Sequence, residues 1–340
     1  MNQEFINTDK SIAVILPAYN EAQTIAGVLR AFHKAAPAAW LFVIDNNSTD
    51  DTAAIANQTL KELGARGDVI FEKRQGKANA VRRAFSEIIA DVYVMVDADN
   101  TYPAEQIWDL VGPILSDKAD LVVGDRRSSG DYRRENKRPM HNFGNNLVQK
   151  LARVVSGTDI VDILSGYRAM SRYFVESYPI LVEGFQLETD MCLFAAQAKM
   201  RTLEVPVSYS DRPEGSFSKL NTFQDGLRVL RCIFDMFRQF SPFTFFAIMA
   251  GFFILLSLLC GSIVIHEWFT TRYITHVPLS VLAVAFGLMG IIALGTGVTL
   301  DAVSYKNRRD LEYVLKQKFK PGYILDERAS SREFDRTKDV

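Results

Sequence analysis

The chain has 340 residues, a formal net charge of −1 and 48% hydrophobic residues. That length suggests about two domains, and the near-zero charge argues against a general nucleic-acid-binding protein. Cys192, Cys232 and Cys260 lack the spacing of metal ligands, so the sequence gives no sign of a disulfide framework or a metal-thiolate site. The N-terminal MNQEFINTDK has no apolar core, which excludes a secretory signal peptide and favours a cytoplasmic first domain.

Strand-like and helical segments alternate from Ser11 to about Gly124. The expected buried strands are Ile12–Leu16, Leu41–Ile44, Val69–Phe71, Val92–Val96 and Leu121–Val123. The expected helices lie near Ala22–Ala35, Thr52–Leu63, Lys77–Ala90 and Pro103–Leu115, with Pro103 in a first helical turn. This alternation predicts βαβ units with right-handed crossovers and a mostly parallel, Rossmann-like sheet of the α/β class.

The apolar run Val92–Val96 ends abruptly in Asp97-Ala98-Asp99. Two carboxylates just beyond the carboxyl end of a strand lie where open α/β sheets bind ligands. Hard divalent cations such as Mg²⁺ prefer oxygen ligands, commonly one or two carboxylates together with substrate phosphates. A lone D-x-D is more often a turn or a helix cap. The hypothesis is that Asp97 and Asp99 hold Mg²⁺ or Mn²⁺ against the diphosphate of a nucleotide donor.

Polar residues also follow the first two strands, in Pro17–Glu21 and Asp45–Asp50. A third cluster, Arg74–Asn79, opens a helix whose N-terminal N–H groups could receive phosphate. Residues 48–50 have an alternative role as helix N-caps, which we expect of at least one of them, and Asn46-Asn47 as a turn. Capping alone does not explain why acidic, amide and basic groups gather at one edge. A phosphate-rich, metal-bridged ligand does.

Several ordered motifs together resemble one known family. They are PAYNEA, DNNSTDDT, GKANAVRRAF, VDADNTYP and SGYRAMSR. The chain is similar to the family 2 glycosyltransferases with the GT-A fold, and within them to the polyprenyl-phosphate glycosyltransferases related to dolichol-phosphate mannose synthase. The resemblance extends from about Ser11 to Phe240 and continues into the apolar C-terminal segments.

The resemblance implies a donor site and a divalent metal bound by Asp97 and Asp99. The residues it assigns to the nucleotide, its diphosphate and the metal are Pro17, Tyr19, Asn20, Glu21, Asp45, Lys77, Asp97, Ala98 and Asp99. Asp45 is suited to accept a hydrogen bond from a base edge, and Glu21 to meet the base or the ribose. The alternative for Glu21 is an acid in the first turn of a helix, where the dipole favours it.

The composition becomes basic from Asp125 onward, and Arg126 follows a buried strand at the same sheet edge. Such a charge run is commonly a solvated face, but an acceptor with a phosphate head requires fixed guanidinium groups. The resemblance places Arg126 near the acceptor phosphate, and we extend that role to Arg138. Asp162, in DILSGYR, is either a candidate base or acceptor-site carboxylate, or a turn-making aspartate.

Two later segments carry weaker assignments. Glu188 and Asp190 lie where family members often have acidic residues near the acceptor, although their spacing departs from the common pattern. In the polar loop RPEGSFSK, we expect Arg212, Ser216 and Lys219 to cover the donor diphosphate or bind the acceptor phosphate. An ordinary linker to the next helix is the alternative interpretation of that loop.

The C-terminal half is apolar. Phe223, Leu227, Leu230, Phe234 and Phe237 form a helical stripe beside arginines, which indicates an interfacial helix or, alternatively, a buried core helix.

Phe243–Ile265 and Leu279–Leu300 contain no charged residue, and each exceeds the ~20 apolar residues that cross a bilayer. Their connection holds one Arg and no Lys, whereas Lys306, Arg308 and Arg309 follow the second span. The positive-inside rule places both ends in the cytoplasm.

The sequence therefore predicts four regions: a cytoplasmic GT-A catalytic domain (1–218), an amphipathic interfacial helix (219–242), a two-helix transmembrane hairpin (243–305) and a basic cytoplasmic tail (306–340). The predicted protein is a multi-pass enzyme of the bacterial plasma membrane and a possible homo-oligomer. It would move one sugar, most simply from a UDP-sugar, to polyprenyl (undecaprenyl) phosphate for a cell-envelope glycan. The alternatives are a processive polysaccharide synthase, although the family's Q-x-x-R-W motif is missing, and a non-catalytic membrane-tethered binder of sugar nucleotides.

Overall fold

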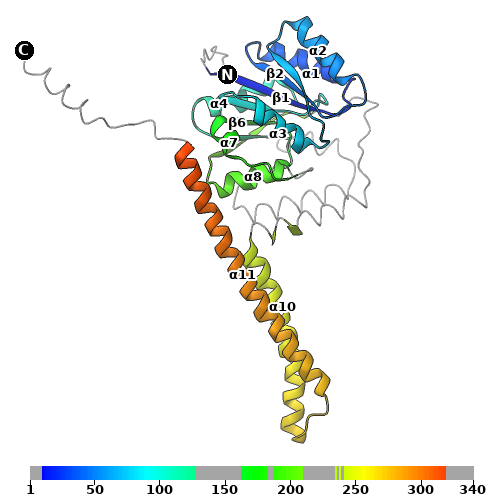
Figure 1. Cartoon of the computed structure of the whole chain (residues 1–340), viewed down its shortest axis with the longest axis vertical. Helices are drawn as coiled ribbons and strands as arrows, with labels where there is room; N and C mark the ends of the chain where they lie inside the picture. Colours follow the sequence, from blue (N-terminus) through cyan, green and yellow to red (C-terminus); the bar gives the residue numbers. More distant parts are fainter. Residues whose placement is uncertain are drawn as a thin grey trace, which may run out of the picture.

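The computed structural model describes residues 10–126, 162–182, 187–209, 234–235, 237–238 and 241–318. It consists of a domain built on one β-sheet and a long helical hairpin that extends from it (Figure 1). The predicted interfacial helix (219–242) and the final polar stretch fall largely outside the described residues, and the four predicted region boundaries stay predictions.

The described strands form a single sheet with the order β3-β2-β1-β4-β6-β5-β7. Its strands are β1 (Ile12–Ala18), β2 (Trp40–Asp45), β3 (Gly67–Phe71), β4 (Val92–Met95), β5 (Leu121–Asp125), β6 (Arg168–Ser171) and β7 (Thr202–Pro206). β6 is antiparallel to its neighbours β4 and β5, whereas the other pairs are parallel. The prediction of a mostly parallel α/β sheet is confirmed.

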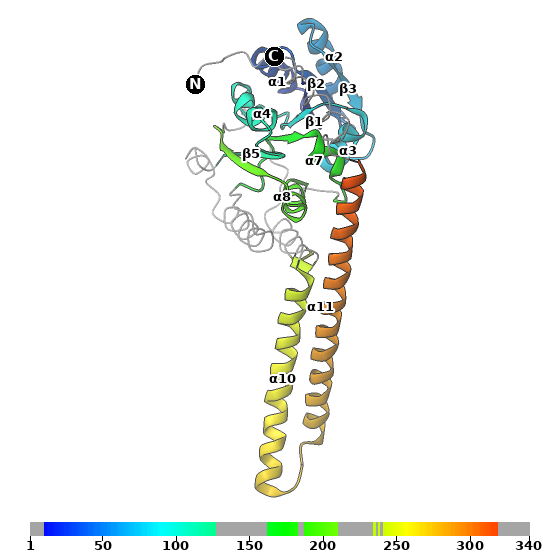
Figure 2. The same cartoon turned by 90° about the vertical axis from the view of Figure 1, so that its left-hand side faces the viewer.

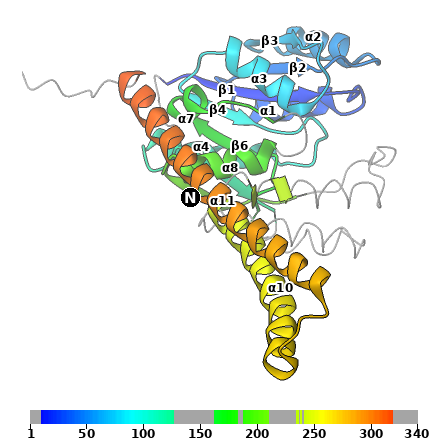
Figure 3. The ribbon, with the colours of Figure 1, turned by 60° about the horizontal axis from the view of Figure 1, so that its bottom comes forward.

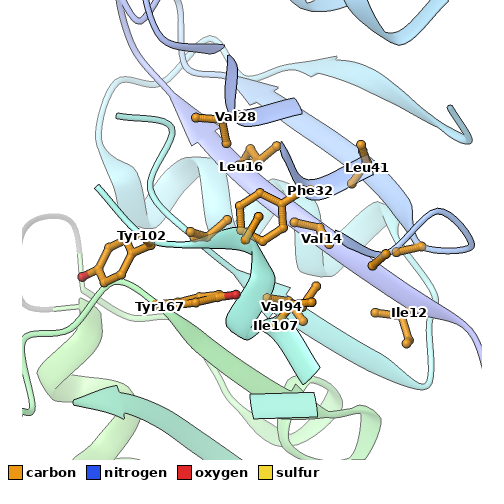
Figure 4. Close-up of a cluster of buried hydrophobic side chains, with 14 of the residues drawn as sticks. Ile12, Val14, Leu16, Val28, Phe32, Leu41, Val94, Tyr102, Ile107 and Tyr167 are labelled. Carbon is orange, nitrogen blue, oxygen red and sulfur yellow. The ribbon is translucent and has the colours of Figure 1, made fainter. Parts of the chain in front are cut away.

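Helices cover both faces of the sheet. They are α1 (Ile25–Ala35), α2 (Thr52–Leu63), α3 (Lys77–Glu87), the 3₁₀ turn η1 (Ala104–Gln106), α4 (Ile107–Leu115), α7 (Arg172–Ser177) and α8 (Leu187–Gln197). Side chains alternate along a strand, so Val14 of β1 packs with α1 and α4 while Ile15 packs with α3, α7 and α8. Figure 4 shows the first of these clusters, with Phe32 packed among Val14, Leu16 and Tyr167.

The predicted elements from Ser11 to Gly124 are present, with two corrections. Pro103 does not lie in a first helical turn: its backbone is extended, and it caps η1, which precedes α4. The first helix begins at Ile25 and not near Ala22, because residues 22–24 form a turn in which the Thr24 N–H donates to the carbonyl of Glu21 (3.1 Å). Glu21 therefore precedes the helix.

Two long apolar helices form the hairpin: α10 (Pro242–Thr271) and α11 (Val277–Lys318). Both are long and apolar enough to cross a membrane, and few of their side chains are buried. Figures 2 and 3 show them side by side. They contain the predicted spans Phe243–Ile265 and Leu279–Leu300. α11 continues well beyond its apolar part, and Leu311 near its end packs against the sheet-domain cluster that contains Phe174 of α7.

Candidate active site

The carboxyl ends of three parallel strands carry asparagines with left-handed backbone. Asn20 follows β1 (φ 56°), Asn47 follows β2 (φ 60°) and Asn100 lies past β4 (φ 61°). Residues other than glycine adopt this conformation rarely, and asparagine does so with the least strain. Such strained positions collect at functional sites. The turn role expected of Asn46-Asn47 is confirmed.

Hydrogen bonds join the loops that follow β1 and β2. The Asn20 N–H donates to Ser48 Oγ (3.1 Å), and the Thr49 N–H donates to Asn20 Oδ1 (2.8 Å). The N-cap position of α2 is Asp51, whose side chain makes no capping hydrogen bond, and the capping bond expected within residues 48–50 comes from Asp50. Those side chains serve the loop junction, although Asp50 Oδ1 also accepts the N–H of Thr52 (3.1 Å).

The end of β2 organises the third loop. Asp45 and Asn46 are both buried. Asn46 Oδ1 accepts the Gly76 N–H (2.7 Å), and Asn46 Nδ2 donates to the Arg74 carbonyl (2.6 Å). Gly76 has φ 121°, which favours glycine, and it is the N-cap of α3. The three clusters seen in the sequence thus lie at one edge, as predicted.

Asp99 is buried and held in one orientation. Its Oδ1 accepts hydrogen bonds from Thr101 Oγ1 (2.6 Å) and from the Thr101 N–H (3.2 Å). The preceding carbonyl, that of Ala98, accepts from Thr24 Oγ1 (2.7 Å), and the same hydroxyl contacts Glu21 Oε2 (3.0 Å). These bonds tie the D-x-D segment to the first loop. Pro17 is the second-last residue of β1, and Tyr19, just after the strand, is exposed.

Asp97 has a cationic partner. Its Oδ1 lies 2.5 Å from Lys77 Nζ, and the same ammonium lies 2.6 Å from Glu188 Oε1. Burial alone would lower the pKa of Lys77, but the two carboxylates outweigh burial and raise that pKa above its usual range. On the other side, a Cβ added at Gly166 would lie 2.3 Å from Asp97 Oδ2. The glycine of the SGYR motif therefore provides room for this carboxylate.

This donor set fits a hard divalent cation. Asp97 and Asp99 offer carboxylate oxygens, the ligands that Mg²⁺ and Mn²⁺ prefer. Within the described ranges, no group of three or more His, Cys, Asp and Glu side chains forms a metal cage. Two carboxylates leave coordination positions for water and substrate phosphates, which is how Mg²⁺ is commonly held at nucleotide sites.

A second charged centre lies next to the first. Asp162 is fully buried, and its two oxygens accept from Arg126 Nε (2.7 Å) and Nη2 (2.8 Å). The Arg126 guanidinium also lies over the ring of Tyr209 (5.4 Å to the centroid). Tyr102 connects the centres, because its ring packs on Tyr209 (5.4 Å) and its hydroxyl accepts the N–H of Gly166 (2.9 Å). Burial raises the pKa of the Tyr102 phenol; the Arg126 guanidinium opposes this rise, and the Asp97 and Asp162 carboxylates add to it.

The structure separates the two acids of α8. Glu188 reaches the site through Lys77, whereas Asp190 accepts a hydrogen bond from the Tyr178 hydroxyl (2.6 Å) within the core. Sequence reasoning missed Tyr102, Tyr209 and Thr24. Tyr102 stands inside VDADNTYP, next to the acids, and that position was the available signal. The expected residues Arg138, Arg212, Ser216 and Lys219 lie outside the described residues.

Several known proteins with similar sequences are named glycosyltransferases. A family model described as glycosyl transferase family 2 matches residues 13–178. Glycosyltransferase AglJ of Haloferax volcanii is 31% identical over 308 residues, which cover 90% of this chain and 98% of the relative. Undecaprenyl-phosphate mannosyltransferase of Micrococcus luteus is 27% identical over 212 residues, 60% of this chain and 85% of that protein.

Among solved structures, glucosyl-3-phosphoglycerate synthase from Mycobacterium tuberculosis, in complex with Mn²⁺, uridine diphosphate and phosphoglyceric acid, superposes with a TM-score of 0.52. Its sequence is 23% identical, and the match covers 68% of this chain and 78% of that one. At this identity the likeness shows a shared fold.

Proposed function

Because the chain belongs to glycosyl transferase family 2, we propose that it moves one sugar from a nucleotide diphosphate sugar to polyprenyl phosphate. The observation that carries the proposal is the pairing of two centres: the acids Asp97 and Asp99 lie beside the Arg126–Asp162 pair, and Tyr102 lies between them. The first centre suits a donor diphosphate and the second an acceptor phosphate. Two apolar helices in the same chain fit an acceptor that resides in a bilayer.

The donor half uses the loops at the carboxyl edge. In this proposal Asp45 and Glu21 contact the nucleoside, and Lys77, at the N-terminus of α3, contacts the diphosphate. Asp97 and Asp99 would hold Mg²⁺ or Mn²⁺. When bound, such a cation offsets the charge that grows on the departing diphosphate. A UDP-sugar is the donor we favour.

The acceptor half relies on Arg126. A phosphate monoester is largely ionised near neutral pH, so its oxygen can attack the anomeric carbon without a strong general base. The new bond joins that oxygen to the anomeric carbon, the bond from this carbon to the diphosphate oxygen breaks, and the nucleoside diphosphate leaves with the electron pair. Attack opposite the leaving group inverts the configuration. Because both oxygens of Asp162 bind Arg126, the geometry favours Asp162 as the group that orients this arginine.

The hairpin supports a position at the cytoplasmic leaflet of a plasma membrane. One Arg lies in the connection between the helices, and Lys306, Arg308 and Arg309 follow the second apolar segment, so the positive-inside rule favours a cytoplasmic sheet domain. In this orientation the water-soluble donor and the lipid-borne phosphate meet on the same side. An interfacial helix at 219–242 and the loop with Arg212, Ser216 and Lys219, together with Arg138, belong to the same proposal.

The test is transfer of labelled sugar by the purified full chain. Donors are a panel of nucleotide sugars, the acceptor is undecaprenyl phosphate in nanodiscs, and Mg²⁺ or Mn²⁺ is added. We expect a single-sugar lipid product and release of nucleoside diphosphate only when the acceptor is present. Products with many sugars would select the processive synthase, and donor binding without nucleotide release would select the non-catalytic binder.

Asp99→Asn provides the sharpest variant. Removing a metal-binding carboxylate should reduce kcat by about 10²-fold or more, because several kcal/mol of charge stabilisation are lost. Asp68→Asn, at an exposed position of β3, is the matched control and should keep full activity. Full turnover by Asp99→Asn would contradict the proposed role of the D-x-D acids.

A further inference from the structure

Lys77 is a cation at the N-terminus of its own helix, where the helix dipole is unfavourable for positive charge. It is the first residue of α3, directly after the N-cap Gly76. A helix N-terminus carries partial positive charge and disfavours a cation. The ammonium nevertheless points to a site where Asp97 (2.5 Å) and Glu188 (2.6 Å) receive it. The two carboxylates therefore explain the position of Lys77, and its own helix does not.

The three side chains are largely enclosed. Their exposed fractions are 21% for Lys77, 31% for Asp97 and 8% for Glu188. Two carboxylates this close to one point would repel each other without a cation between them. The ammonium thus supplies the charge compensation that a divalent cation would otherwise supply to Asp97.

Lys77 and a metal compete for the same carboxylate. Lys77 contacts Oδ1 of Asp97, and Gly166 lies against Oδ2. Asp99 is held in one orientation, because the Thr101 hydroxyl and N–H both donate to its Oδ1. A cation that reaches Asp99 therefore meets an oriented acid, whereas one that reaches Asp97 must first displace an ammonium or share its oxygen.

We propose that Lys77 is a resident counter-ion of the donor site: it keeps free divalent cations weakly bound and transfers from Asp97 to the donor diphosphate when metal and nucleotide arrive together. Glu188 is the positioning residue that holds Lys77 within reach of Asp97 and of the donor diphosphate. The site then favours the metal–nucleotide complex over either component alone. This inference rests on the proposed donor site, but it requires neither sugar transfer nor a lipid acceptor.

Arg82 strengthens the placement of Glu188. It lies on α3 with Lys77, and its guanidinium donates to the carbonyls of Ile180 (2.8 Å) and Val182 (3.5 Å), in the segment before α8. α3 therefore contacts both the approach to α8 and, through Lys77, its first turn. These contacts fix the helix that presents Glu188 against the helix that presents Lys77.

The experiment measures binding of Mn²⁺ to the full chain in nanodiscs by electron paramagnetic resonance, first alone and then with UDP. For Lys77→Met we expect Mn²⁺ alone to bind about tenfold or more tightly, because a competing charge is removed. UDP binding in the presence of Mn²⁺ should weaken about tenfold, because the diphosphate loses an ammonium. These opposite directions distinguish a counter-ion from a simple phosphate ligand. Unchanged or weaker binding of Mn²⁺ alone would overturn the proposal.

Two further variants control for charge and folding. Lys77→Met with Glu188→Gln restores the net charge of the pair but removes the ammonium, and Mn²⁺ alone should still bind more tightly than in the wild type. A return to the wild-type affinity would show that net charge alone caused the gain, and would also overturn the proposal. Arg83→Met removes another cation of α3, from an exposed pair with Glu87, and should leave both affinities unchanged. Failure of sugar transfer would contradict the proposed function and leave these binding results intact.

Discussion

The sheet domain buries its apolar side chains, whereas the helical hairpin exposes them. Leu29 of α1 and Val94 of β4 are 0% exposed, while Leu258 of α10 is 65% and Ile291 of α11 66% exposed. The exposed apolar surface of the hairpin fits a membrane, which both helices are long and apolar enough to cross. In water, burial of apolar surface drives packing. In hydrocarbon that drive is absent, and helices associate through close contact of small residues.

In the hairpin, α10 and α11 approach each other closely at small residues. A Cβ added at Gly290 of α11 would lie 2.8 Å from Ile254 Cγ1, and one added at Gly297 would lie 2.8 Å from Phe246 Cβ. Ser257 Oγ donates to the Ala283 carbonyl (2.8 Å) across the same contact. Backbone proximity, one hydrogen bond and a stacked Phe253–Phe286 pair (6.3 Å between ring centroids) join these helices. The sheet domain instead relies on a large cluster of buried apolar side chains.

The largest expected difference between the two regions comes from placing a charge on an exposed apolar residue. The charge should be costly in the hairpin and nearly neutral in the sheet domain. Leu258→Arg places a guanidinium near the middle of α10, where insertion into a bilayer costs about 2.5–3.5 kcal/mol. Ile89→Arg, at a position 78% exposed in the sheet domain, should change stability by no more than about 0.5 kcal/mol. Membrane fractionation and yield of folded protein measure both. Equal tolerance of the two substitutions would show that α10 does not face lipid.

Small-residue packing in the hairpin gives the next effect. Gly290→Ala forces Ile254 or the helix backbone to move, and overpacking of this kind costs about 1–3 kcal/mol. Gly295→Ala, five positions along the same helix, meets nothing within 4 Å and serves as the control. Thermal unfolding in detergent should separate the two variants. Identical unfolding temperatures would contradict close contact at Gly290.

The sheet domain has a glycine of the same kind, but it serves the site. In Gly166→Ala, the new methyl group would displace the Asp97 carboxylate, which is a side-chain end and can move, so folding should persist. We expect affinity for the metal–nucleotide complex to fall about tenfold. Gly112→Ala, within α4, has open space around it and should bind as the wild type does. Isothermal calorimetry with UDP and Mn²⁺ measures the difference, and loss of folding in place of affinity would contradict it.

The two regions also differ in how well their sequences predicted them. Alternating apolar runs located β1 to β5, and uncharged runs located both long helices, because periodicity and length are local properties. The sequence analysis did not predict β6 or β7. In β6, Arg168 is fully buried and donates to the carbonyls of Ser165 (2.8 Å) and Ile163 (2.5 Å). A buried arginine in a short strand carries no apolar pattern.

The site shows the same division. The motifs located Asp97, Asp99, Arg126 and Asp162, but they did not identify the side chains that each of these residues contacts. The Lys77–Glu188 contact joins residues far apart in the chain, and so does the bidentate Arg126–Asp162 pair. Such partners depend on which elements the sheet order brings together, and a single sequence does not contain that order in local form. The end of α11 is similar, since nothing in its sequence indicated that Leu311 packs against the sheet domain.

The smallest expected effect concerns the Glu72–Arg74 ion pair of the sheet domain, in the loop before Lys77. Hydrogen bonds from Arg74 lower the pKa of Glu72 to about 2, from an ordinary value of 4.5. A carboxyl whose pKa falls on folding stabilises the folded state above its unfolded pKa, and this contribution is lost as the pH falls from 4.5 toward 2. Because Arg74 is largely exposed, solvent screens the pair and the contribution is small.

Glu72→Gln should therefore lower the unfolding temperature of the sheet domain by about 2 °C or less at pH 7. The difference from the wild type should stay constant down to about pH 4.5, the ordinary pKa of the group, and then narrow with further acidification. Arg74→Met removes the other partner and should follow the same pH profile. Calorimetry across this pH range measures both variants in one series. A difference that does not change with pH would assign the effect to the shape of the loop, in which Asn46 binds the Arg74 carbonyl, and would remove the charge of Glu72 as its cause.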